Sequence, residues 1–193
     1  MPCPEKFMES LEKFRVPAEI AAQIGDGFAG ITSKSPKKER AAFFARAVEI
    51  LEKHIDVQTL RELMEENACC RSGAREKASK AFARENADDS LDRKLARIPS
   101  VANMGTPQRN PDGTITVHAV RWQVDGQFRC ACPNFSGLKR AAPVSKNYCL
   151  CCAGHFRHHY EIMLGVKLQT LEIVSSPLNS GGMDPCVIRF AVL

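Results

Sequence analysis

The sequence predicts an α+β fold: a helical N-terminal half, then an antiparallel sheet with a helix packed on one face. Helical apolar spacing recurs over residues 17–98, whereas alternating apolar and polar residues prevail after residue 114. Between them, residues 105–113 are rich in Gly, Pro, Asn and Asp, as in a linker or surface loop. We therefore expect a helical region over residues 1–104 and a cysteine-rich α+β domain over residues 105–193.

Five helices are expected in the N-terminal half. The first lies within Pro17–Phe28, which ends in a group of glycines. The second begins at Ser35-Pro36, where the serine hydroxyl caps the helix and the proline fixes its first φ angle. Asp56 caps the third. A charged helix over Ala74–Arg84 and a short one near Leu91–Ile98 complete a bundle or cap.

The C-terminal half reads as β-β-α-β-β. Thr114–Val124 alternates in the manner of a strand, Asp125-Gly126 is a hairpin turn signal, and Gln127–Cys132 resumes the strand. Gly165 closes the helix that follows. The remaining expected elements are that helix, from Cys149 to Gly165, and the strands Val166–Val174 and Cys186–Val192.

Composition narrows the class of protein. No stretch resembles a signal peptide, and no run of about 18 apolar residues could span a membrane, so we expect a cytoplasmic protein with reduced thiols. The net charge of +5 comes mainly from residues 100–193, with 9 basic and 5 acidic residues. These basic residues are scattered, with one Trp and two Tyr in the chain, so we expect a small-molecule partner rather than nucleic acid. The oligomeric state stays open.

Seven of the nine cysteines fall into three groups, and this spacing suits metal or thiol chemistry better than disulfides. Zinc takes four Cys or His ligands, commonly from two short-spaced pairs. Cys130 and Cys132 with Cys149 and Cys151 provide two such pairs. Additional candidate ligands are Cys69, Cys70 and Cys152. An iron–sulfur cluster would use the same thiolates and is the less favoured alternative to zinc.

A second interpretation is nucleophilic catalysis by Cys152 with His155. Cys152 falls in the first turn of a helix, where free N–H groups stabilise a thiolate, and His155 follows three residues later. Such a pair could form a covalent intermediate with a carbonyl or imine carbon. We also expect Cys69-Cys70 to pack against the cysteines of this helix. Cys186, in an apolar strand, is expected to be a buried structural thiol.

The C-terminal segments Tyr148–His155, Leu171–Leu178 and Pro185–Phe190 carry a family resemblance. Over about Cys130–Leu193 the chain resembles the bacterial and archaeal families grouped around L-2-amino-thiazoline-4-carboxylate hydrolase, most closely an uncharacterised cysteine-rich branch. The resemblance implies an α+β domain and ring-opening hydrolysis of a thiazoline or a related C–N bond. The same region is similar to ligand-binding sensor domains of the vinyl-reductase type.

We therefore expect a zinc-binding protein that binds or hydrolyses a small molecule. The competing hypothesis is a non-catalytic ligand-binding or sensory domain, in which the thiols are structural or redox groups. The extra Cys152 and the paired Cys69-Cys70 depart from the family pattern and fit metal ligation better than a single catalytic thiol.

Overall fold

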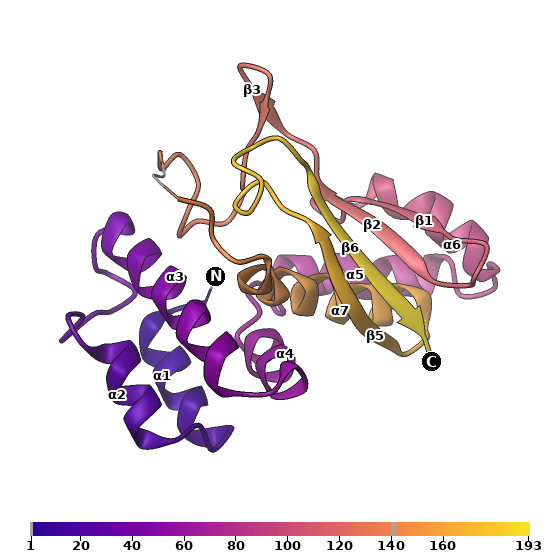
Figure 1. Cartoon of the computed structure of the whole chain (residues 1–193). Helices are drawn as coiled ribbons and strands as arrows, with labels where there is room; N and C mark the ends of the chain where they lie inside the picture. Colours follow the sequence, from indigo (N-terminus) through magenta and orange to yellow (C-terminus); the bar gives the residue numbers. More distant parts are fainter. Residues whose placement is uncertain (1, 140–141) are drawn as a thin grey trace.

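The computed structural model describes residues 2–139 and 142–193 and has the expected α+β fold. Figure 1 shows α1 to α4 grouped on one side, while α5, α6 and α7 lie along the sheet. No helix among these residues is long and apolar enough to cross a membrane. The helices are α1 (Pro4–Lys13), α2 (Ala18–Gly25), α3 (Lys37–His54), α4 (Val57–Glu66), α5 (Ala74–Glu85), α6 (Leu91–Arg97) and α7 (Leu150–Leu164), with 3-10 turns η1 (Ile98–Ser100) and η2 (Lys146–Cys149). The strands are β1 (Thr106–Arg109), β2 (Ile115–Val120), β3 (Gln123–Val124), β4 (Gln127–Phe128), β5 (Leu168–Ser175) and β6 (Cys186–Val192).

The main sheet is antiparallel throughout, in the order β1-β2-β6-β5. Val117 of β2 stands opposite Ile188 of β6, and Ile115 stands opposite Phe190. All four side chains are buried, and helix α7 packs on β5. Because side chains alternate along a strand, these residues define the inner face of the sheet.

Two strand predictions were wrong in detail. The expected linker contains β1, an edge strand that tolerates Pro107 because an edge residue can do without one ladder hydrogen bond. The strand expected over Gln127–Cys132 stops at Phe128, because Cys132 begins a turn: its carbonyl accepts from the N–H groups of Phe135 and Ser136. The expected Asp125-Gly126 turn is present, with both φ angles positive, but it joins β3 to β4 in a separate two-stranded ribbon.

The helix starts show which capping signals operate. Asp56 caps α4 as expected, accepting from the N–H groups of Gln58 and Thr59 at 3.0 and 2.9 Å. The expected cap by Ser35 was wrong, because its hydroxyl accepts from the N–H of Thr32 and Pro36 occupies the N-cap position of α3. Helix α1 was not predicted at all.

One hydrophobic core runs from the N-terminal helices to the sheet. Phe7, Phe43 and Phe44 pack edge to face, and the Phe44 ring lies 5.8 Å from that of the fully buried Tyr148. This stack joins α1 and α3 to the turn that precedes α7. The proposed boundary near residue 104 stays a prediction, and the core is continuous across it.

Helices α4 and α7 come closest at Gly154. A Cβ atom there would lie 2.7 Å from the carbonyl oxygen of Glu65 and 3.0 Å from Cβ of Ala68. Only glycine permits this approach. The Arg157 guanidinium pairs with the buried Glu65 carboxylate at 2.8 Å, one turn further along α7. Burial, the largest influence on this carboxyl, raises its pKa.

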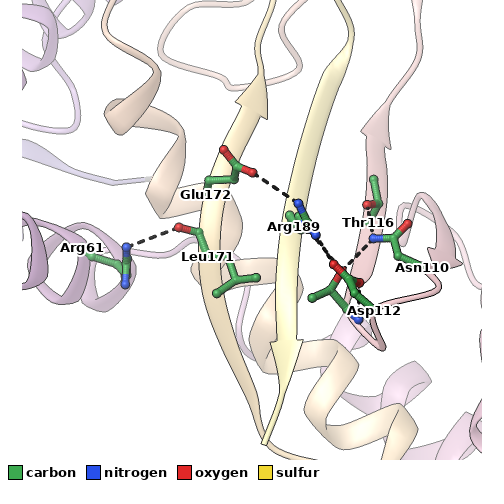
Figure 2. A network of polar contacts seen from close by, with 8 residues as sticks. Arg61, Asn110, Asp112, Thr116, Leu171, Glu172 and Arg189 are labelled. Carbon is green, nitrogen blue, oxygen red and sulfur yellow. Dashed lines mark hydrogen bonds and ion pairs between the residues drawn. The ribbon is translucent and has the colours of Figure 1, made fainter.

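A polar network covers the outer face of the sheet (Figure 2). Arg189 of β6 lies between Glu172 of β5, at 3.9 Å, and Asp112 in the β1-β2 connection. At the edge of the sheet, Arg61 of α4 donates to the carbonyl of Leu171 at 3.3 Å. The two faces are therefore distinct: the outer one is polar, and the inner one faces α7 and the cysteines.

We predict that Gly154→Ala destabilises the fold by about 1–3 kcal/mol, because the added methyl group overpacks the contact with α4. Urea unfolding measures this. Gly25→Ala is the matched control: its Cβ would meet only Met8 Cε at 3.8 Å, and alanine is the better helix former. Equal stability of the two variants would contradict the close approach.

Candidate thiol site

The start of α7 presents three cysteines. Cys149 ends η2, and Cys151 and Cys152 follow in the first turn of α7. Cys149 and Cys151 are buried, and Cys152 is half-buried. The Sγ atom of Cys149 lies 3.1 Å from the hydroxyl of Ser176, which follows β5. The start of the helix is thus tied to the far end of that strand.

Two further cysteines approach from the turn after β4. The N–H of Cys132 donates to Sγ of Cys130 at 3.4 Å, so both sulfurs belong to one tight turn. Sγ of Cys132 lies 3.1 Å from the phenol oxygen of Tyr148, which also accepts from the Asn134 side chain at 3.3 Å. Tyr148 directly precedes Cys149, so it links the two sequence-predicted cysteine pairs.

Cys186 opens β6 and is half-buried. By strand alternation it shares the inner face of the sheet with Ile188 and Phe190, toward α7. The ionised form of Cys152 or Cys132 would raise its pKa, so its sulfur belongs to the same neighbourhood. The sequence interpretation treated Cys186 as a structural thiol outside the site. Its alternation with Ile188 and Phe190 was the signal that could have found it.

The connection between α4 and α5 brings Cys69 and Cys70 to the same neighbourhood. Nδ1 of His155 lies 3.0 Å from the carbonyl oxygen of Cys69, and Nε2 of His159 lies 2.8 Å from that of Cys70. Cys70 has a φ angle of +59°, which is strained for a residue other than glycine. Two imidazoles of α7 therefore hold a strained loop in place. Cys69 and Cys70 meet this helix through its histidines, and their expected packing against its cysteines stays a prediction.

Cys152 is the electrostatic centre of this group. A thiolate at Cys152 would raise the pKa of six other cysteines drawn from four segments of the chain. These six, with Cys152 itself, are called the thiol site: Cys69, Cys130, Cys132, Cys149, Cys151 and Cys186.

Most of these thiols are held in the neutral form. Burial first, and then the charge of Cys152, raises the pKa of Cys69 to about 11 and that of Cys186 to about 12. The pKa of Cys151 is raised chiefly because its S–H donates to Cys152. The same hydrogen bond lowers the pKa of Cys152, which makes it the member of the site that ionises most readily.

His155 is a neutral imidazole with a defined tautomer. Burial lowers its pKa to about 3. Because a carbonyl only accepts, Nδ1 carries the proton that it donates to Cys69, and Nε2 keeps its lone pair. That nitrogen can act as a metal ligand, whereas its lowered pKa makes it a weak base.

A cavity of about 520 Å³ opens beside Cys130. Its described lining includes Phe128, Phe135 and Leu178 as well as Arg129. It is the cavity that adjoins the Cys130–Cys132 turn, so a small molecule in it would meet the edge of the thiol site.

Every cysteine proposed as a zinc ligand from the sequence lies in this neighbourhood: Cys130, Cys132, Cys149 and Cys151. Of the additional candidates, Cys69 and Cys152 belong to it as well, whereas the Cys70 side chain is exposed. In residues 2–139 and 142–193, no three Cys, His, Asp or Glu side chains are arranged so that they could hold a metal ion. The thiols are gathered but do not point at one common centre.

We predict that His159→Ala destabilises the protein by about 1–3 kcal/mol, because the carbonyl of Cys70 and the hydroxyl of Ser79 each lose a buried partner. The freed loop should also let iodoacetamide reach the half-buried Cys69 faster than in the wild type. Urea unfolding and mass-spectrometric mapping of the alkylated cysteines measure both effects. The control is His54→Ala, at an exposed position. Equal alkylation of Cys69 in the two variants would argue against His159 holding this loop in place.

The His155 tautomer predicts a dependence of stability on pH. Its pKa is lower in the folded protein, so the unfolded chain binds more protons below its ordinary value of 6.5. The contribution of His155 to the free energy of unfolding is therefore complete above that pH and is lost as the pH drops toward 3. Between about pH 7.5 and pH 5 we expect the free energy of unfolding to fall by about 2 kcal/mol because of this residue. His155→Gln should show a smaller loss over this range, whereas His54→Gln should not. Parallel pH profiles for His155→Gln and the wild type would refute the assignment.

Comparisons with known proteins supply no relative: no protein family model, no curated protein and no solved structure matches the chain.

Proposed function

We propose that the thiol site binds a thiophilic metal ion, zinc in preference to an iron–sulfur cluster, and that the adjoining cavity takes a small molecule. The observation that carries this proposal is that three cysteine-bearing segments meet at the start of α7: Sγ of Cys132 lies 3.1 Å from the hydroxyl of Tyr148, which precedes Cys149, and His155 contacts the carbonyl of Cys69 at 3.0 Å. A hydrophobic core gains nothing specific from so many thiols, whereas a metal site needs them together.

Charge balance supports a bound cation. Several thiolates cannot ionise together in a buried place unless positive charge is supplied, because each raises the pKa of the others. A divalent metal would supply that charge, and its binding would release the thiol protons.

A metal would require some of these sulfurs to move, because no three side chains of the described residues are arranged to hold one. Rotating a cysteine by one χ1 rotamer moves its sulfur by roughly 3 Å, without moving the backbone. We propose Cys130, Cys132, Cys149 and Cys151 as the ligands, because each pair is already joined through Tyr148 and its neighbours. Cys152 and Cys69 are the additional donors, and Cys186 now joins them.

Zinc is preferred because four thiolates satisfy it without further groups, and it needs no redox partner. An iron–sulfur cluster would take the same four cysteines. Elemental analysis distinguishes zinc from an iron–sulfur cluster, because it identifies the bound metal. We assign the protein to the cytoplasm, where thiols stay reduced and available.

A second candidate function is nucleophilic hydrolysis by Cys152 with His155. The lowered pKa of Cys152, caused by the hydrogen bond from Cys151, favours it over the other thiols as an attacking group. Nε2 of His155 has a free lone pair close to these thiols, but burial lowers the pKa of this imidazole to about 3 and makes it a weak proton acceptor. Such a pair would act on a C–N bond of a small heterocycle, in line with the family resemblance over Cys130–Leu193. If neither metal nor reactive thiol is found, a ligand-binding or sensory domain remains.

We predict about one zinc ion or more per chain in protein purified anaerobically without added metal, measured by elemental analysis. Cys132→Ser and Cys151→Ser should each lose most of it, because each removes a buried ligand. Cys3→Ser is the matched control: this cysteine lies at the start of α1, outside the thiol site, and the variant should keep its metal.

Less than about 0.2 equivalents of zinc or iron would overturn the metal proposal. Alkylation then decides between the other two functions. Fast, selective modification of Cys152 near neutral pH, lost in Cys152→Ser, supports the nucleophile; uniform inertness of the cysteines leaves the binding domain.

A further inference from the structure

The cavity beside Cys130 has rigid walls made from three segments of the chain. The N–H of Phe128 donates to the carbonyl of Gly182 at 2.8 Å, and the N–H of Val144 donates to that of Leu178 at 2.9 Å. Gly182 has a φ angle of +91°, and a Cβ there would lie 3.1 Å from the carbonyl oxygen of Phe128. Main-chain hydrogen bonds thus hold the walls in place before any ligand arrives.

The described lining of this cavity carries charge of one sign. Arg129 and Lys139 are its charged side chains, and no Asp or Glu of the described residues lines it. No ion pair joins either side chain to another residue within the described ranges. Other basic groups have acidic partners: Arg157 pairs with Glu65, and Arg189 with Asp112. Two uncompensated cations at one hollow favour an anion there.

The rest of the lining is largely apolar. Phe128, Phe135, Leu138, Pro177 and Leu178 contribute rings and aliphatic groups. At about 520 Å³ the cavity falls in the range of small-molecule sites. The cavity therefore combines apolar side chains with two basic ones.

We propose that this cavity binds a small organic anion, with its apolar body against Phe128, Phe135 and Leu178 and its negative group at Arg129 and Lys139. This rests on the small-molecule part of the proposed function and names the class of ligand. Because the cavity includes Cys130, the bound anion lies against the thiol site rather than on a remote surface.

The probe for this site is 8-anilinonaphthalene-1-sulfonate, an apolar anion that fluoresces when it leaves water. The full-length protein should bind one equivalent saturably, and the affinity should fall about fivefold or more in Arg129→Gln and further in Arg129→Gln/Lys139→Gln, because the sulfonate loses its charged partners. The uncharged analogue N-phenyl-1-naphthylamine should bind more weakly than the sulfonate. Arg121→Gln, an exposed residue outside the cavity, is the matched control and should bind as the wild type does.

Leu178→Ala tests the apolar half and should weaken both probes. A cooperative thermal transition in each variant shows that the probe is not reporting a loosened fold. Unchanged sulfonate affinity in the double variant, or equal affinity for the neutral analogue, overturns the proposal. Metal content is measured on the same samples. Selective anion binding without metal supports this inference and overturns the metal proposal. Metal without selective anion binding supports the metal proposal and overturns this inference.

Discussion

The thiol site depends on the packing of α7 against α4 and the α4-α5 connection. Gly154 lets the backbone of α4 approach α7, and His155 and His159 bind the carbonyls of Cys69 and Cys70 from the same helix. Because these contacts lie within two turns of Cys152, they set where the first turn of α7 stands. Without them the loop with Cys69 would have no reason to approach the other thiols.

Burial gives the gathered thiols their chemistry. Removing a thiol from water disfavours its ionised form, so most of the thiol site is neutral, with Cys152 as the exception. A site that is neutral alone, but whose thiols lose their protons to water when a cation binds, fits metal binding. The same asymmetry gives Cys152 the strongest nucleophilic character, so the two proposed functions are alternative uses of one arrangement.

The sequence predicted much of the fold because several elements carry local signals. Asp56 caps α4, Asp125-Gly126 forms the turn of a ribbon, and Gly165 ends α7 with a φ angle of +73°. Helix α1 and strand β1 escaped prediction because their stability comes from tertiary partners: Phe7 packs against α3, and β1 pairs with β2. The cysteine groups were found from spacing alone. Cys186 was missed although its alternation with Ile188 and Phe190 places it on the buried face of β6. Only the assembled sheet shows that this face meets α7.

The decisive measurement is a crystal structure of the anaerobically purified protein with an anomalous map at the zinc edge. If the thiol site holds zinc, an anomalous peak lies about 2.3 Å from sulfurs of the Cys130–Cys132 turn and of the first turn of α7. Neutral, separate thiols in these segments, with no peak near them and none after incubation with zinc, would contradict zinc binding at this site.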